Sequence, residues 1–250
     1  MPIDPIFYFA AIPAVIIMGL AKGGFAGLGI LAVPIMALGM SPVEAAAILL
    51  PILLVQDVFS VRAFGGQRDD SILLRMVPGA VLGIFAGWLL ASFVSVAAVE
   101  AAIGLTTIGF AFQRIIAERR GVPAAAARPW AGVLMGAVSG FTSQIAHAGG
   151  PPFQMHVLPR KLPRDVFLGT SSVFFALINW LKVPAYAALG QFTPQNLKAA
   201  AVLMPVAIIA TWAGTILVRR VDGPRFYAII HALMIIVGAK LAWDGLAALM

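Results

Sequence analysis

The sequence predicts an all-α polytopic membrane protein with two inverted-topology repeats, each a glycine-broken re-entrant hairpin followed by three transmembrane helices. Hydrophobic residues fill 61% of the 250 positions and charged residues only 11%, whereas roughly 25% of a soluble domain is charged. Two glycine-rich stretches, residues 21–29 and 138–152, interrupt apolar sequence at matching places in the two halves. The Lys and Arg residues lie mainly in short segments between apolar stretches.

The apolar segments define the predicted helices, and several begin with a recognisable start signal. Ser41-Pro42-Val43-Glu44 combines a capping box with a proline at the first helical position. Thr193-Pro194 and Gly223-Pro224 also place proline where its missing N–H group costs nothing. The predicted segments are residues 6–20, 25–38, 42–61, 72–91, 96–117, 129–143, 165–186, 194–218 and 224–249.

The basic loops predict the topology, because cytoplasmic loops of membrane proteins carry an excess of Lys and Arg. The turns at residues 39–41, 91–95 and 190–196 have no charge and are expected outside, together with both ends of the chain. Four clusters are expected in the cytoplasm: Arg62, Arg68 and Arg75; Arg114, Arg119, Arg120 and Arg128; Arg160, Lys161 and Arg164; Arg219, Arg220 and Arg225.

This topology makes the two broken segments re-entrant. Residues 6–38 begin and end outside, and residues 129–158 begin and end inside. Each arm has at most about 16 residues, fewer than the roughly 20 that cross a bilayer, so the tips are expected near the midplane. Glycine-rich backbone at that depth is tolerated only where it lines protein or a polar cavity.

Six full spans remain, three in each half, and an odd number forces the halves into opposite orientations. The predicted repeats are residues 1–120 and 121–250. Corresponding residues occur in the same order in both halves: Met18-Gly19 matches Met135-Gly136, and Pro78 with Gly87 matches Pro205 with Gly214. Inverted repeats with broken segments at the midplane are a common design of secondary transporters.

The two tips predict an anion site, because a broken helix presents backbone N–H groups and the positive end of its dipole. The first tip also has a cation, and the second has neutral donors beside glycines that let the backbone approach closely. Gln56 and Asn179 lie at equivalent depths in the two repeats. The candidate binding residues are Lys22, Gly23, Gly24, Gln56, Ser139, Thr142, Ser143, Gln144, His147, Gly149, Gly150 and Asn179.

Ionisable residues inside a membrane usually have a function. Lys22 is predicted to bind the anion, with snorkelling or pairing with Asp57 as the alternatives. Asp57 is a candidate for coupling to a proton or cation, or else forms a salt bridge with Lys22 or Lys182. His147 is a candidate donor and proton carrier. Lys182, also a coupling candidate, lies near the outer end of its span and is expected to be exposed or to snorkel.

Several classes of site are not expected. The chain has no Cys, so thiolate chemistry and Cys-ligated metals are excluded. His147 has no second ligand at metal spacing, so no metal or cofactor is predicted. The net charge of +7 lies in the loops, which leaves no basic face for nucleic acid. The first ten residues lack a positive n-region, so the first apolar segment is expected to be retained.

The chain resembles the TauE/SafE family of anion permeases. The likeness lies in the opening GLAKGGFAGLG with its downstream Pro34, and in SGFTSQIAHAGGPP followed by a proline-flanked basic loop. The resemblance implies a multi-pass protein of the bacterial inner membrane. It also implies a secondary transporter for small sulfur-containing or organic anions such as sulfite, thiosulfate, sulfoacetate or other sulfonates.

Two other functions compete with this interpretation. An anion channel would use the same donors to line a pore. An intramembrane hydrolase would use Ser139 with His147, but Ala137 stands where the rhomboid-like motif needs glycine, so an enzyme is not expected. The direction of transport, the choice between a proton, sodium or no coupling ion, and the oligomeric state stay open.

Overall fold

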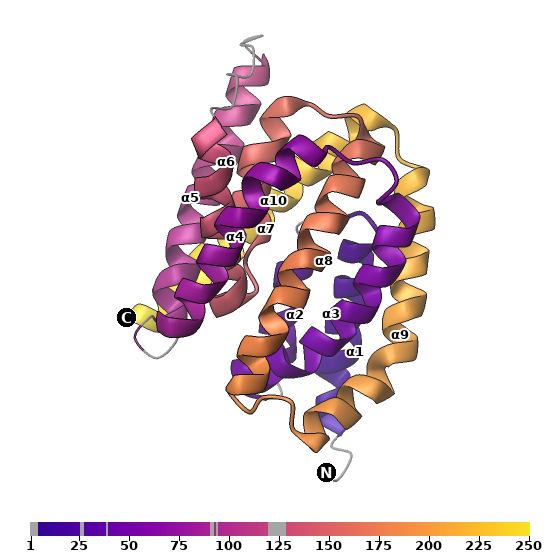
Figure 1. Cartoon of the computed structure of the whole chain (residues 1–250), viewed down its shortest axis with the longest axis vertical. Helices are drawn as coiled ribbons and strands as arrows, with labels where there is room; N and C mark the ends of the chain where they lie inside the picture. Colours follow the sequence, from indigo (N-terminus) through magenta and orange to yellow (C-terminus); the bar gives the residue numbers. More distant parts are fainter. Residues whose placement is uncertain (1–4, 26–27, 39, 91–92, 94, 120–128) are drawn as a thin grey trace.

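A computed structural model describes residues 5–25, 28–38, 40–90, 93, 95–119 and 129–250, which form α-helices and two short 3-10 helices (Figure 1). The predicted repeat boundary after residue 120, and the loop arginines Arg120 and Arg128, lie outside the described residues. The elements are α1 (Pro5–Lys22), η1 (Leu28–Leu31), α2 (Ala32–Met36), α3 (Pro42–Phe64), α4 (Asp70–Leu90), α5 (Val96–Arg119), α6 (Pro129–Ala146), α7 (Gly150–Val157), η2 (Leu158–Arg160), α8 (Arg164–Ala188), α9 (Pro194–Arg219) and α10 (Gly223–Leu249).

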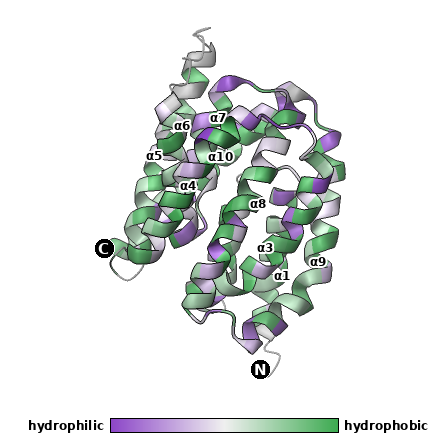
Figure 2. Ribbon diagram, viewed as in Figure 1, coloured by the Kyte–Doolittle hydropathy of each residue, from purple (hydrophilic) through white to green (hydrophobic). Residues whose placement is uncertain are grey.

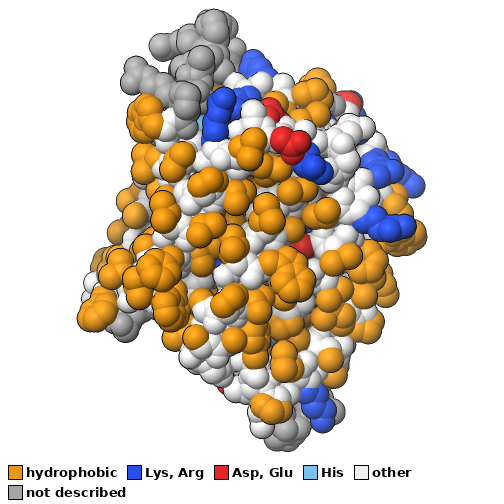
Figure 3. Space-filling model, in the orientation of Figure 1, with side chains coloured by type: hydrophobic (Ala, Val, Ile, Leu, Met, Phe, Trp, Pro, Cys, Tyr) orange, Lys and Arg blue, Asp and Glu red, His pale blue; other side chains and the backbone are white. Residues whose placement is uncertain are grey.

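The helices have the length and composition of a multi-pass membrane protein. In the described chain, α3, α4, α8, α9 and α10 are long and apolar enough to cross a bilayer, and α5 contributes the apolar stretch Val96–Phe112. Hydrophobic residues dominate the helices in Figure 2, and the visible face in Figure 3 carries a broad apolar band with most Lys and Arg near one end. The predicted fold class, an all-helical polytopic membrane protein, is therefore confirmed.

The predicted helix starts are formed as the sequence suggests. The Ser41 hydroxyl accepts a hydrogen bond from the Glu44 N–H at 3.2 Å, and the Thr193 hydroxyl accepts one from Asn196 at 3.1 Å. The start of α10 is capped by a residue that the sequence analysis did not single out: the carboxylate of Asp222 accepts from the Arg225 N–H at 2.9 Å. These bonds satisfy N–H groups that have no partner inside a helix.

The chain breaks at the two predicted places, but the arms of each hairpin are unequal. The first arms, α1 and α6, have 18 residues each, so the prediction of at most about 16 residues is wrong for them. At 1.5 Å per residue each is about 27 Å long. The helices continue until the backbone turns left-handed, at Gly24 with φ +135° and at His147 with φ 52°. The returning helices, η1–α2 and α7–η2, are short.

Close helix packing brings the two hairpins against their neighbours. A Cβ atom at Gly79 of α4 would lie 2.0 Å from the carbonyl oxygen of Val133 on α6, and one at Gly140 of α6 would lie 2.2 Å from the oxygen of Ala80. On the other side, a Cβ atom at Gly23 would lie 2.5 Å from the Cα atom of Gly214 on α9. Small residues at Gly79 and Ala80 therefore allow the backbones of α4 and α6 to approach closely.

The helix contacts follow a pattern that exchanges the two predicted repeats. In the predicted repeats α1, α3, α4 and α5 correspond to α6, α8, α9 and α10. Under this correspondence the packed pair α4–α6 becomes the packed pair α9–α1, and α4–α8 becomes α9–α3. The packed pairs α3–α8 and α5–α10 are unchanged by the exchange. Figure 1 shows two groups of long helices, α4, α5, α6 and α10 in one and α1, α3, α8 and α9 in the other. This pattern supports the inverted repeat, which stays a prediction.

Candidate functional site

The two hairpin tips line a common cavity of about 100 Å³ between the helix groups. A water molecule needs about 10–15 Å³ of such space, so the cavity has room for a small oxyanion. Seven of the predicted binding residues line it: Lys22, Gly24, Ser143, His147, Gly149, Gly150 and Asn179. The other five, Gly23, Gln56, Ser139, Thr142 and Gln144, are not among its lining residues.

Lys22, the last residue of α1, forms a salt bridge with Asp57 of α3. The second carboxylate oxygen of Asp57 accepts a hydrogen bond from the Asn179 amide of α8 at 2.7 Å. Asp57 is 1% exposed, and its charge is balanced by the ammonium group that it contacts. Lys22 therefore pairs with Asp57, which was the alternative to anion binding, and it also lines the cavity.

The second tip is organised around His147, which follows the end of α6. Its Nδ1 atom lies 3.2 Å from the Ser143 carbonyl oxygen, and its Nε2 atom lies 3.4 Å from the Tyr186 hydroxyl. The imidazole stacks on the Tyr186 ring with 11° between the planes. The left-handed backbone turns the chain at this residue, so the imidazole lies where α6 stops and lines the cavity.

Lys182 lies inside the protein rather than at its surface. The side chain is 1% exposed, and its Nζ atom donates to the Ser143 hydroxyl at 3.2 Å and lies 3.0 Å from Nδ1 of His147. The prediction that Lys182 is exposed or snorkels is therefore wrong. The residue shares the inward face of α8 with Asn179, while Trp180 between them is 58% exposed, so the long side chain extends toward the second tip.

Two predicted binding residues instead hold the second tip in shape. The Ser139 hydroxyl donates to the Gly149 carbonyl oxygen at 2.7 Å, and the Thr142 hydroxyl donates to the Ala148 carbonyl oxygen at 3.0 Å. Both side chains are buried on α6. They fasten the loop between α6 and α7 to the preceding helix, so their role in this structure is to position the tip.

The remaining three predicted residues pack between helices. The Gln56 amide donates to the Ala207 carbonyl oxygen of α9 at 3.4 Å, Gly23 packs against α9, and Gln144 covers Gly87 of α4. Gln56 and Asn179, which were predicted to lie at equivalent depths, face different neighbours, because only Asn179 lines the cavity.

Helix α7 supplies fewer backbone donors than its glycines suggest. Its second and third residues, Pro151 and Pro152, have no N–H group. The Phe153 N–H lies 3.4 Å from the Gly149 oxygen. The Phe153 ring packs against Phe167 and Phe174 of α8, with the centroids of Phe153 and Phe174 5.0 Å apart. This aromatic cluster fixes the start of α7 beside the cavity.

Sequence reasoning missed a polar stripe on α8. Ser171 and Ser172 line the cavity together with Phe175. They precede Asn179 by about two helical turns, so they share its face. Helical periodicity counted back from Asn179 is the signal that would have found them.

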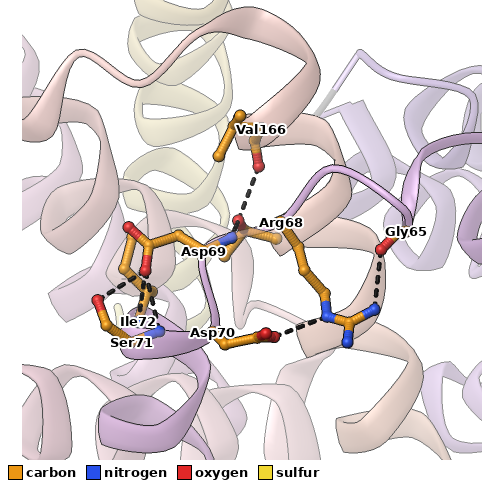
Figure 4. Close-up of polar contacts among 8 residues, drawn as sticks. Gly65, Arg68, Asp69, Asp70, Ser71, Ile72 and Val166 are labelled. Carbon is orange, nitrogen blue, oxygen red and sulfur yellow. Dashed lines mark hydrogen bonds and ion pairs between the residues drawn. The ribbon is translucent and has the colours of Figure 1, made fainter.

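The loop between α3 and α4 is tied to α8 on the side of the basic clusters (Figure 4). The Asp69 backbone N–H donates to the Thr170 hydroxyl at 2.9 Å, and the Asp69 carboxylate accepts from the Ser71 N–H at 2.9 Å. Burial acts to raise the pKa of Asp69, but the hydrogen bonds from Ser71 and Ile72 and the charge of Arg160 outweigh it, so the pKa lies below 3.8. Figure 4 also shows Arg68 bridging Asp70 and the Gly65 carbonyl oxygen.

Comparison with known proteins supports one family. A family model described as "Sulfite exporter TauE/SafE" matches residues 11–241. That range includes both hairpin tips and every residue that lines the cavity. No curated protein and no solved structure gave a significant match.

Proposed function

The chain belongs to the sulfite exporter TauE/SafE family, and on this premise we propose that it is a secondary transporter whose anion binds between the two hairpin tips. Family membership and the apolar helices make it a multi-pass inner-membrane protein of a transporter family with small anionic substrates. The substrates that we propose are sulfite, thiosulfate, sulfoacetate or other sulfonates.

The charge of the cavity is the observation that carries this proposal. Lys22 and Lys182 both line it, and Asp57 pairs with Lys22. Among the described residues no salt bridge is formed by Lys182. With both lysines and Asp57 ionised, the formal charge is positive by one unit. A buried charge is costly unless it is paired, so the cavity favours an anion.

The cavity also offers neutral donors that suit an oxyanion. The hydroxyl groups of Ser143, Ser171 and Ser172 come from two different helices. A Cβ atom at Gly150 would contact only Ile30 Cδ1, at 3.8 Å, so the glycine backbone is accessible beside them. Hydroxyl groups donate hydrogen bonds to an oxyanion without adding charge. We therefore assign anion binding to Lys182, these hydroxyls and the backbone at Gly149 and Gly150, with Lys22 at the opposite wall.

The arrangement of the helices suggests how the site opens. The first tip belongs to α1, in one helix group, and the second tip to α6, in the other. A movement of one group against the other separates the tips, and the proposed inverted repeats, residues 1–120 and 121–250, give the two directions related geometries.

Transport by purified protein in liposomes tests the proposal. We expect labelled sulfite to enter in a saturable manner and to exchange with internal sulfite, which a channel does not do. Lys182→Gln should reduce the exchange rate at least about tenfold because the loss of a charge-assisted bond costs about 1.5–3 kcal/mol. Lys198→Gln is the matched control, since Lys198 is exposed at the start of α9.

Two outcomes would contradict this function. If sulfite and sulfonates crossed the membrane no faster than in empty liposomes, the protein would not be a transporter for these anions. Flux that neither saturates nor exchanges, but carries current, would favour the alternative of an anion channel.

A further inference from the structure

We propose that Lys182 and His147 form a single-proton site, and that the transporter moves one proton together with each anion. This inference rests on the proposed function, since it names the coupling ion of the same cavity. It comes from the contact between two titratable groups on different elements, α8 and the turn after α6, rather than from either residue alone.

The geometry allows the pair to hold one proton. An ammonium group has three donors and no acceptor, and a protonated imidazole donates through both nitrogens. Nζ of Lys182 and Nδ1 of His147 are 3.0 Å apart, so one of them must supply a lone pair to the hydrogen bond between them. The two groups therefore cannot both be protonated in this arrangement.

The surrounding charges make this proton depend on the anion. On the elements around the pair, the titratable groups near the cavity are Lys22, Asp57 and Tyr186, and Asp57 is already bonded to Lys22 and Asn179. The other acidic and basic groups of these elements lie toward the helix ends: Tyr8 on α1, Glu44 and Arg62 on α3, Asp70 and Arg75 on α4, His156 on α7, and Arg164 and Asp165 on α8.

When the Lys182–His147 pair holds its proton, it is positively charged and contacts no carboxylate among the described residues. A bound anion supplies the missing negative charge. Without the proton, the anion would enter a cavity with no net positive charge. Each ligand then strengthens the binding of the other by the same factor, as linkage requires. One positive and one negative charge enter together, and both leave together.

The structure also contains a path by which the proton leaves the cavity. Nε2 of His147 lies 3.4 Å from the Tyr186 hydroxyl and 3.5 Å from the Ala46 carbonyl oxygen. Tyr186 is one helical turn beyond Lys182 toward the end of α8, and Ala46 lies near the start of α3. Both ends are expected outside, so the proton passes from Nζ of Lys182 to His147 and then toward the outer side.

Two measurements on the same liposomes test the coupling, with sulfite as the probe. Counterflow at equal pH on both sides exchanges sulfite without net proton movement, whereas accumulation driven by an imposed pH gradient needs the coupled proton. Lys182→Arg keeps a cation that does not release its proton, and His147→Gln keeps an acceptor that cannot carry one. Sulfite's own protonation is the same for every variant, so differences report on the protein.

In both variants we expect counterflow to fall, because Lys182 and His147 also line the anion site, but gradient-driven accumulation to fall further and to disappear. Lys198→Arg should match the wild type in both measurements. Accumulation that survives in proportion to counterflow, in whichever variant folds, overturns the proton site. Wild-type protein without sulfite counterflow would instead overturn the proposed function itself, so the two failures are distinguishable.

Discussion

At the residue scale, the two lysines that line the cavity differ, because among the described residues only Lys22 forms a salt bridge with a carboxylate. Lys22 and Asp57 neutralise each other across α1 and α3, and Asn179 binds the remaining oxygen of the carboxylate. Lys182 instead contacts Ser143 and His147. We therefore expect Lys22 to contribute mainly to structure, and we propose that Lys182 supplies the charge that attracts the anion.

This division predicts the effect of removing Lys22. Lys22→Ala leaves Asp57 buried without its cation, so the free energy of unfolding should fall by about 3–5 kcal/mol. The double variant Lys22→Ala/Asp57→Asn should recover most of this loss, because no unpaired charge remains. Thermal unfolding in detergent measures both. Lys240→Ala, which breaks a partly exposed pair with Asp244, is the control and should cost at most about 1 kcal/mol. Equal effects of Lys22→Ala and Lys240→Ala would contradict the structural role.

The pKa of Asp69 predicts an acid-sensitive loop. Because its pKa is lowered in the folded protein, the carboxylate adds stability above its ordinary value, and this is lost as the pH falls through the folded value. The protection of the amides of residues 65–72, taken relative to the intrinsic exchange rate at each pH, should therefore fall below about pH 4, near the ordinary pKa of Asp. In Asp69→Asn the protection should already be lower at neutral pH and should fall less with acid. An identical pH profile in the variant would refute this.

At the element scale, hydrogen bonds from α6 hold the loop of the second hairpin in place. Ser139 and Thr142 fasten the loop to α6, and Phe153 anchors α7 to α8. The glycines and prolines were sufficient to predict this break from the sequence. Which hydroxyl groups face the cavity and which bind the loop could not be predicted, because that depends on the direction in which α6 enters the turn.

Two adjacent glycines should respond differently to substitution. A Cβ atom at Gly149 would lie 2.8 Å from the Ser139 carbonyl oxygen, whereas the nearest atom to one at Gly150 is Ile30 Cδ1 at 3.8 Å. Gly149→Ala should therefore disturb the tip and lower the free energy of unfolding by about 1–3 kcal/mol. Gly150→Val should leave stability nearly intact but fill the cavity and abolish sulfite binding. Thermal unfolding and sulfite binding are measured on both variants. A larger loss of stability in Gly150→Val than in Gly149→Ala, or sulfite binding that survives in Gly150→Val, would contradict this prediction.

At the scale of the whole molecule, composition and the apolar segments were sufficient to predict the membrane class and the long helices, and the glycine-rich stretches to predict the places of the breaks. Helix α7 (Gly150–Val157) was not among the predicted segments. Periodicity along α8 could have added Ser171 and Ser172. The burial of Lys182 could not be predicted, because sequence position indicates depth along the helix but not the neighbour that its side chain reaches. Pairing of α1 with α9 and of α4 with α6 likewise arises from contacts between distant segments.

The inverted repeat predicts on which side each loop lies. The chain has no Cys, so single cysteines can be introduced at exposed positions and labelled in intact cells. Phe93→Cys and Gln195→Cys should react with an impermeant maleimide from outside, because both turns are predicted to be external, and Gln67→Cys should not. Labelling of Gln67→Cys from outside, or protection of Gln195→Cys, would contradict opposite orientations of the two halves.

The central claim is that the anion binds between the two tips. Selenite, a heavier analogue of sulfite, can be located directly by anomalous scattering in crystals of the full chain. We predict one selenium position inside the cavity, with selenite oxygens within hydrogen-bond distance, about 2.7–3.2 Å, of Nζ of Lys182 and the Ser143 hydroxyl. The peak should vanish in Gly150→Val crystals. Selenite bound elsewhere, with no contact to either tip, would contradict the account.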